Sequence, residues 1–204
     1  MSEPILTALV LAAGSSRRLG QPKQLLPYRG TTLLGWVVAQ AEACPALDEV
    51  LVVLGHEGQA VLASLALGRA RAVFNDEHQE GCAASYRAGL AAADPRAAGV
   101  LILPGDQPGI TTAMLARVAA DWRATGAELL AADYEGTLGQ PLLFGRARFP
   151  DLAALHGDKA AWKLVDRAGP TLCRVPMGRP LPADVDTLED AARLAGDNEG
   201  RTTG

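Results

Sequence analysis

Short apolar runs alternate with amphipathic segments along the first two thirds of the chain, and this alternation predicts the fold. Continuous runs of branched apolar residues, typical of buried strands, lie at 8–11, 49–54, 70–74, 100–103 and 128–132. Helices are expected at 33–43, 58–67, 82–93 and 113–123, with Thr31 or Thr32 capping the first and Thr111 or Thr112 the last. The alternation predicts a three-layer α/β/α fold with a mostly parallel sheet, and ligands beyond the carboxyl ends of its strands.

The regular pattern weakens after Gly136. Residues 139–144 are expected to form a turn that leads into a strand, two short helices are expected around 156–158, and 173–175 reads as a short strand. The chain has 204 residues, 49% of them hydrophobic, which is enough for one sizeable core. We therefore expect a single domain over 1–195, followed by a disordered polar tail at 196–204.

Composition narrows the classes of partner. The formal net charge of −4 argues against nucleic acid, because proteins that bind its phosphate backbone normally carry a basic face. No basic segment leads into a signal-type apolar region and no apolar run approaches ~18 residues, so neither secretion nor membrane binding is expected. The three cysteines, Cys44, Cys82 and Cys173, form neither a zinc motif nor a disulfide pattern. These features predict a soluble, cytoplasmic protein with reduced thiols.

The segment 7–28 carries the first candidate chemistry. A predicted strand runs into small residues around Gly14, and positive charges follow at Arg17, Arg18 and Lys23. Exposed backbone N–H groups next to fixed positive charges are typical of a phosphate site. The spacing fits neither a P-loop nor the dinucleotide fingerprint G-x-G-x-x-G. The alternative is a solvated basic loop without a ligand, but only three of the nineteen basic residues are lysines, which makes Lys23 distinctive.

Two acidic segments are candidates for binding a metal ion. Asp106 directly follows the predicted strand 100–103, at the edge where ligands are expected. Asp184 and Asp186 lie two residues apart, so an extended chain places both on one side. Carboxylate oxygens together with substrate phosphates are the usual ligands of Mg²⁺. Each segment also has an alternative structural role, Asp106 as a turn or capping residue and Asp186 or Thr187 as the cap of a helix from Leu188.

These segments together resemble a known family. The first loop resembles the signature L-A-A-G-x-S-x-R-M-G-x-x-K of nucleotidyltransferases with a nucleotide-diphospho-sugar-transferase-like fold. The residues that match it are Leu11, Ala12, Ala13, Gly14, Ser16, Arg18, Gly20 and Lys23. The later motifs resemble the molybdenum cofactor cytidylyltransferase family over nearly the full chain. They are Asn75, Gly81, Ser85 and Gly89, then Asp106-Gln107-Pro108, 139–144, 157–162 and 184–190.

The resemblance implies roles for individual residues. Arg18, Lys23 and Asp106 would be catalytic, and Asp106 with Asp186 would hold Mg²⁺. The nucleotide would be bound by Leu11, Ala12, Ala13, Gly14, Ser16, Lys23, Asn75, Gly81 and Ser85. An alanine at position 13 goes with cytidine nucleotides in the family, so CTP is expected rather than GTP. The segment after Gly136 would face the second substrate.

The resemblance predicts an Mg²⁺-dependent transfer of CMP from CTP to the phosphate of a molybdopterin-type cofactor, with release of pyrophosphate. His78, Gln140 and 160–162 depart from the family pattern, and they bear on the second substrate rather than on the nucleotide chemistry. Two alternatives remain: an NAD(P)H-dependent reductase on the same fold, and a non-catalytic accessory protein that hands a cofactor to a molybdenum hydroxylase. No histidine cluster or activated nucleophile points to zinc or covalent catalysis.

Overall fold

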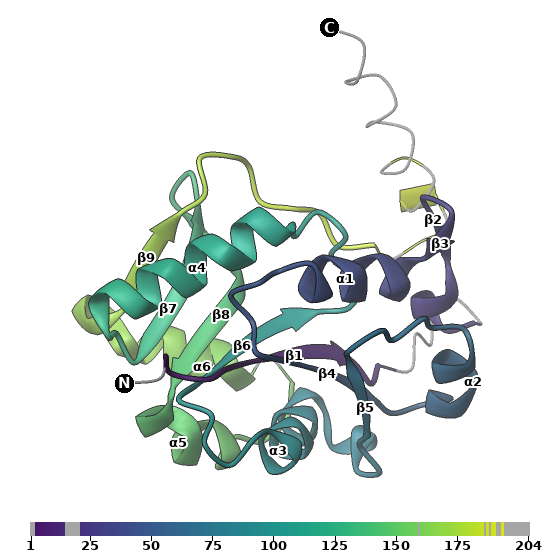
Figure 1. The fold of residues 1–204 in the computed structure, drawn as a ribbon, viewed down its shortest axis with the longest axis horizontal. Coiled ribbons are helices and arrows are strands. Elements are labelled where there is room, and N and C mark those ends of the chain that lie inside the picture. The colour runs from purple at the N-terminus through teal and green to yellow at the C-terminus, as the bar shows by residue number, and fades with distance from the viewer. Residues whose placement is uncertain are drawn as a thin grey trace, which may run out of the picture.

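The protein is built on one seven-stranded sheet. The structure, a computed structural model, describes residues 3–14, 21–158, 160–185, 187, 189–190 and 193. Within them the strand order is β5-β4-β1-β6-β8-β7-β9 (Figure 1). These strands are β1 (Leu6–Ala12), β4 (Glu49–Leu54), β5 (Arg71–Phe74), β6 (Gly99–Pro104), β7 (Leu129–Tyr134), β8 (Thr137–Gly145) and β9 (Cys173–Pro176). A separate small hairpin pairs β2 (Pro27–Tyr28) with β3 (Thr31–Thr32).

Helices cover both faces of the sheet, which confirms the expected three layers (Figure 1). One face packs against α1 (Leu33–Glu42), α2 (Gly58–Ala63) and α4 (Thr112–Thr125), and the other against α3 (Cys82–Ala92), α5 (Phe149–Ala153) and α6 (Ala160–Ala168). The alternation along β1 decides which residue meets which layer, since Ala8 and Val10 join the first core and Leu9 joins the second. None of the described helices is long and apolar enough to cross a membrane.

Most neighbouring strands are parallel, as predicted. The pairs β1–β4, β4–β5, β1–β6 and β7–β9 are parallel, whereas β8 runs antiparallel to both β6 and β7. Strand β8 reverses because a two-residue turn joins it to β7, with Glu135 at φ 54° and Gly136 at φ 96°. Positive φ at both central residues is the turn geometry that suits a tight hairpin. The turn therefore comes before Thr137, and the expectation of a turn at 139–144 was wrong.

Thr32 and Thr111 cap α1 and α4, each accepting a hydrogen bond from a backbone N–H three residues on. Helix α2 is shorter than predicted. It ends at Ala63 rather than near Leu67, because Ser64 turns its hydroxyl back onto the carbonyl of Val61 at 2.7 Å and its own N–H bonds the same carbonyl. The expected tail at 196–204 lies outside the described residues, as does most of the helix expected from Leu188.

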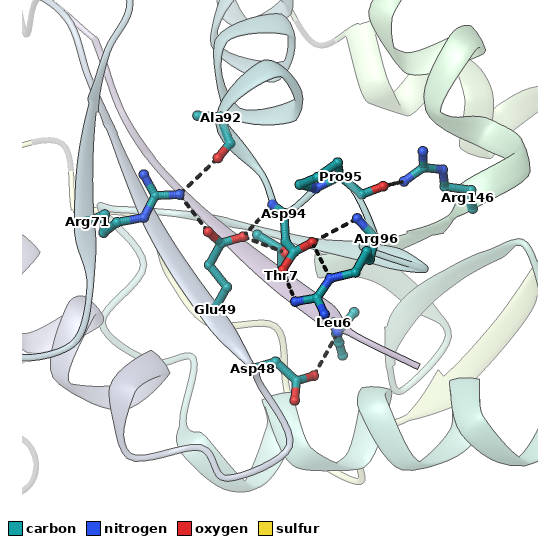
Figure 2. Close-up of polar contacts among 10 residues, drawn as sticks. All are labelled: Leu6, Thr7, Asp48, Glu49, Arg71, Ala92, Asp94, Pro95, Arg96 and Arg146. Carbon is teal, nitrogen blue, oxygen red and sulfur yellow. Dashed lines mark hydrogen bonds and ion pairs between the residues drawn. The ribbon is translucent and has the colours of Figure 1, made fainter. Parts of the chain in front are cut away.

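A polar cluster ties the starts of the central strands to the loop before β6 (Figure 2). The Glu49 carboxylate accepts hydrogen bonds from the fully buried Thr7 hydroxyl at 2.9 Å, the Asp94 N–H at 3.0 Å and Arg71 Nη2 at 2.6 Å. Arg96 hydrogen-bonds the neighbouring Asp94 carboxylate and lowers its pKa to about 2. The cluster fixes the starts of β1, β4 and β5 relative to the loop that precedes β6.

Replacing Glu49 tests the contribution of this cluster. Glu49→Ala leaves the buried Thr7 hydroxyl and the Asp94 N–H without their acceptor, so we expect the free energy of unfolding to fall by about 1–3 kcal/mol. Urea denaturation followed by circular dichroism measures this change. Asp166→Ala, at an exposed position on α6, is the matched control and should stay within about 0.5 kcal/mol of the parent protein. Equal stability of the two variants would contradict the assignment.

Candidate functional site

The carboxyl ends of β1, β4 and β6 meet at one edge of the sheet, and a pocket of about 1210 Å³ opens there. Direct backbone contacts hold the three loops together, because Gly105 N–H donates to Leu11 O at 2.8 Å and His56 N–H donates to Ala13 O at 3.5 Å. The approach is close enough to require glycine at 55, where a Cβ would lie 2.8 Å from Ala13 O and 2.6 Å from the Cβ of His78. Parallel pairing thus assembles one continuous wall.

Lys23 and Asp106 meet in this pocket although 83 residues separate them in the sequence. Lys23 begins the short 3-10 helix η1 (Lys23–Leu25) after the first loop, and Asp106 follows β6. The Lys23 ammonium forms an ion pair with Asp106 Oδ2, and each side chain is 21% exposed. The phosphate-binding candidate and the metal-binding candidate predicted from separate motifs therefore form one site.

Gln24 fixes the backbone where the first loop begins, at Ala12 to Gly14, a role that the sequence did not predict. Its side chain is buried, with 3% of the residue exposed, and its Nε2 donates to Ala12 O at 2.8 Å and to Gly14 O at 3.1 Å. An amide that engages these two carbonyls fixes the orientation of the peptide planes between them. A glutamine directly after the signature lysine was the available signal, but nothing in the sequence shows that it folds back onto the loop.

The chain returns from β9 to the pocket through residues 177–185, the C-terminal strap. Val185 N–H donates to Asp106 O at 3.1 Å, which fixes the strap against the loop after β6. On the same strap, Asp184 Oδ1 accepts a hydrogen bond from Gln107 Nε2. Gln107 Oε1 is buried and has no partner among the described residues. Two carboxylates and a spare amide oxygen therefore gather in a small region of the pocket.

The hydrogen bonds of Thr187 decide which residue of the acidic motif, Asp186 or Thr187, acts as a helix cap. Thr187 Oγ1 accepts from Asp190 N–H at 3.0 Å, and Asp190 Oδ2 accepts from Thr187 N–H at 3.1 Å. Reciprocal bonds of this kind form a capping box, so Thr187 supplies the cap. Asp186 itself lies outside the described residues.

A small apolar cluster connects the strap to the first loop. Val185 is fully buried and packs with Leu26, Tyr28 and Leu33, and Trp36 lies against them. The Trp36 indole N–H also donates to the carbonyl of Pro108 at 3.2 Å, next to Gln107. The exit of the first loop, the Asp106 loop and the strap are therefore packed as a unit.

The amino end of α3 forms the opposite wall. Asn75 is buried, and its amide donates to Ser85 Oγ at 3.1 Å while its Oδ1 accepts from Glu77 N–H at 3.0 Å. Gly81 and Ser85 line the pocket, but Asn75 does not. Asp158 Oδ1 accepts the Cys82 N–H at 3.1 Å at the first turn of α3. Asn75 is therefore linked to the pocket through its hydrogen bond to Ser85, and its own contact with a nucleotide stays a prediction.

Cys82 and Tyr86 line the same wall as neutral groups. Burial raises the pKa of the Cys82 thiol, and the Asp158 and Asp106 carboxylates raise it further. Burial likewise raises the pKa of Tyr86, whose hydroxyl lies 3.5 Å from Cys82 Sγ. A thiol held protonated is a poor nucleophile. The wall therefore suits binding, in agreement with the absence of an activated nucleophile in the sequence.

The pocket brings together most of the predicted site residues. Those that line it are Leu11, Ala12, Ala13, Gly14, Lys23, Gly81, Ser85, Asp106 and Asp184. Ser16 and Arg18 lie outside the described residues, as Asp186 does. Three of the positions that depart from the family pattern, His78, Gln140 and Trp162, also line the pocket, whereas Ala160 and Ala161 are fully buried in the core. The departures therefore lie partly in the pocket and partly in the core.

Comparison with known proteins fixes the family. The chain matches the model of the MobA-like NTP transferase domain over residues 8–172. This protein belongs to that family. A nucleotidyl transferase from Methanothermobacter thermautotrophicus is 27% identical, with a TM-score of 0.79 and coverage of 97% of this chain and 99% of that one. The expected nucleotide-diphospho-sugar-transferase-like fold and a nucleotidyltransferase-like function are thereby supported.

Two further relatives extend over nearly the whole chain. Nicotine blue oxidoreductase from Paenarthrobacter nicotinovorans is 33% identical, covering 94% of this chain and 97% of its own. Rv0371c from Mycobacterium tuberculosis H37Rv is 40% identical with a TM-score of 0.86, covering 95% and 99%. A structure of Rv0371c in complex with manganese is 39% identical with a TM-score of 0.81, covering 94% and 98%. The proteins similar to this chain thus include one whose structure contains manganese and one named as an oxidoreductase.

Replacing Gln24 tests whether it shapes the loop. Gln24→Met keeps the side-chain length but removes both donors, so we expect the free energy of unfolding to fall by about 1–3 kcal/mol and nucleoside triphosphate affinity to fall roughly tenfold. Urea denaturation and isothermal titration with Mg·CTP measure the two effects. Gln59→Met, at an exposed position on α2, should change neither. Unchanged affinity in Gln24→Met would remove the positioning role.

Proposed function

We propose that this protein transfers CMP from CTP to the phosphate of a molybdopterin-type acceptor and releases pyrophosphate. The observation that carries the proposal is the meeting of Lys23 with Asp106 in the pocket at the carboxyl edge of the sheet. Nucleotidyl transfer needs a cation for the triphosphate and a carboxylate for a metal ion within reach of each other. The family match over residues 8–172 supports the same chemistry.

The reaction requires no nucleophile from the protein. A phosphate oxygen of the acceptor attacks the α-phosphorus of CTP, a new P–O bond forms, and the bond to the β-phosphate oxygen breaks as pyrophosphate leaves. The ammonium of Lys23 and the guanidinium of Arg18 would neutralise charge on the triphosphate, and the backbone at Ala13, Gly14 and Ser16 would hold it. The raised pKa of Cys82 fits this direct displacement, because it keeps the thiol of that wall protonated.

The residues present fit Mg²⁺, a hard cation that prefers oxygen ligands. Asp106 and Asp184 line the pocket, and Gln107 contributes a buried oxygen without a described partner. No group of three metal-binding side chains occurs among the residues that the structure describes, which suits an ion that takes one or two carboxylates and completes its shell with phosphates and water. Asp106 with Asp186 or Asp184 would hold it. When bound, Mg²⁺ would stabilise the charge that develops on the transferring phosphate.

The choice of CTP rests on the first loop. Ala13 lines the pocket and packs against the glycine at 55, so its methyl group narrows the space next to the loop backbone. A smaller pyrimidine base suits such a narrowed space better than a guanine does. Of the departures, Gln140 and Trp162 line the pocket together with Leu138 and Leu181, and would face the acceptor, whereas His78 lies beside Gly55 next to the first loop.

A second candidate function is an NAD(P)H-dependent reductase. It is favoured by the 33% identity to nicotine blue oxidoreductase over 94% of the chain, and a loop that binds a triphosphate can also bind the pyrophosphate of a dinucleotide. The sequence lacks the fingerprint G-x-G-x-x-G, which argues against it. A non-catalytic protein that hands a molybdenum cofactor to a hydroxylase is the third candidate.

Thermal-shift measurements separate these candidates, because a ligand that binds only the native state raises its melting temperature. CTP, GTP, ATP, UTP, NADH and NADPH are each tested with and without Mg²⁺. Stabilisation selectively by Mg·CTP, followed by pyrophosphate release on addition of molybdopterin, supports nucleotidyl transfer. Stabilisation by NADPH alone, independent of metal and with oxidation of the cofactor, supports the reductase. Stabilisation by the molybdenum cofactor without turnover supports the accessory protein.

Substitution of the two central residues gives the direct test. Lys23→Ala removes the charge that faces the triphosphate and Asp106→Ala removes the metal carboxylate, so we expect each to lower the rate of pyrophosphate release at least 100-fold. Circular dichroism should show a folded protein in both cases, since both side chains lie in the pocket rather than in the core. Lys163→Ala, which removes an exposed lysine on α6, should retain full turnover. Near-normal rates in the first two variants would overturn the proposed function.

A further inference from the structure

The geometry points to a second role for Lys23. We propose that, before nucleotide binds, the Lys23 ammonium occupies the charge position of the metal ion on Asp106, and that the arriving triphosphate draws it away. Metal and nucleotide then bind as a cooperative pair, and neither binds well alone. The inference rests on the proposed function in one respect, which is that Asp106 is the metal ligand.

Lys23 contacts the proposed metal ligand, Asp106, directly. Lys23 Nζ is ion-paired to Asp106 Oδ2, and the two side chains are equally shielded, at 21% exposure each. A divalent ion that binds this carboxylate oxygen must displace the ammonium or share the oxygen with it. Two positive centres a few ångströms apart repel each other, so the ion pair lowers the affinity of Asp106 for free metal.

The backbone beside Lys23 is anchored, whereas its side chain is flexible. Gln24, the residue next to Lys23, anchors the backbone through its hydrogen bonds to Ala12 O and Gly14 O. The backbone of η1 is therefore fixed, and a change of partner by Lys23 requires only rotation within its four-carbon side chain. That side chain can exchange a carboxylate for a phosphate on the adjacent loop without a change in the fold.

Asp184 has a different kind of partner from Asp106. This carboxylate lines the same pocket, but its described partner is the neutral amide of Gln107 rather than a cation. A metal ion approaching Asp184 meets no opposing charge from Gln107. The obstruction is thus specific to Asp106, and two otherwise similar carboxylates provide an internal comparison.

Because the two binding equilibria are linked, the ion pair weakens the binding of nucleotide as well as the binding of metal. If the triphosphate and Asp106 compete for the ammonium, removing either competitor must strengthen the other contact of Lys23. Nucleotide without metal therefore binds against the ion pair, and metal without nucleotide does the same. Only the metal–nucleotide complex would satisfy both groups, because Asp106 would then hold the metal ion while the Lys23 ammonium would bind the phosphates.

Isothermal titration with Mn²⁺ in the absence of nucleotide tests the first half. Lys23→Met keeps the side-chain bulk and removes the charge, so we expect Mn²⁺ to bind roughly tenfold more tightly than to the parent protein. Lys23→Arg keeps a cation beside Asp106 and should remain within about twofold of the parent. Lys163→Met, which removes a positive charge from the exposed surface of α6, should also remain within about twofold. Equal Mn²⁺ affinity in Lys23→Met and Lys163→Met would overturn the proposal.

Titration with CTP in the presence of EDTA tests the second half. Asp106→Asn removes the carboxylate that competes with the triphosphate for Lys23, and we expect metal-free CTP to bind several-fold more tightly than to the parent. Asp184→Asn removes the same charge from the same pocket but leaves the ion pair of Lys23 with Asp106 in place, and should give a clearly smaller gain. If the affinity for CTP rises equally in the two variants, the rise comes from the loss of one negative charge alone, and the proposal is overturned. This arm decides the question even if Lys23→Met does not fold.

The design also separates this proposal from the proposed function. If Mn²⁺ binding is lost in Asp106→Asn but unchanged in Lys23→Met, Asp106 is the metal ligand and only the exchange is wrong. If Mn²⁺ binding is the same in Asp106→Asn as in the parent protein, Asp106 is not the ligand, and the metal-dependent mechanism fails together with the exchange.

Discussion

Strand β1 pairs in parallel with β4 on one side and with β6 on the other, and the position of the pocket residues depends on this pairing. Because all three strands run the same way, the loops that follow them leave the sheet at one edge. The hydrogen bond from Gly105 N–H to Leu11 O extends the pairing just beyond the regular strands. It is this continuity that brings the loop after β6, with Asp106, next to the loop that leads to Lys23. The polar cluster around Glu49 secures the same strands at their other ends.

The pocket is completed by a segment that belongs to neither of the two helical layers. The C-terminal strap leaves β9 at the far edge of the sheet and returns to the loop after β6 (Figure 1). Val185 anchors it twice, through its N–H to Asp106 O and through its side chain in the cluster with Leu26, Tyr28 and Leu33. Asp184, the residue before Val185, is thereby held near the exit of the first loop by apolar packing, so the proposed metal site depends on a hydrophobic contact as well as on carboxylates.

Membership in the MobA-like NTP transferase family and similarity to a protein named as an oxidoreductase are compatible with one site. The phosphate site proposed at this edge of the sheet would suit both nucleoside triphosphates and dinucleotides, because both contain linked phosphates. What separates the two chemistries is the pair of carboxylates, since hydride transfer from a dinucleotide needs no metal, whereas nucleotidyl transfer does. The residues that depart from the cytidylyltransferase pattern, His78, Gln140 and Trp162, lie in the pocket lining. Lys23 and Asp106 therefore share the pocket with residues that differ from the cytidylyltransferase pattern.

The sequence by itself determined the order and type of the elements, because the strand and helix periods are local properties of the chain; β4 and the cap of α1 at Thr32 agree with it closely. It also marked Lys23 and Asp106 as separate candidates. Only the tertiary structure decided that these two form an ion pair, that Gln24 supports the loop, and that Asn75 lies behind Ser85 rather than in the pocket. It also moved the turn before β8 to Glu135 and Gly136. The reason is physical: a period records which face of an element is buried, whereas the partner of a polar side chain is set by strand pairing and loop packing between residues far apart in the chain.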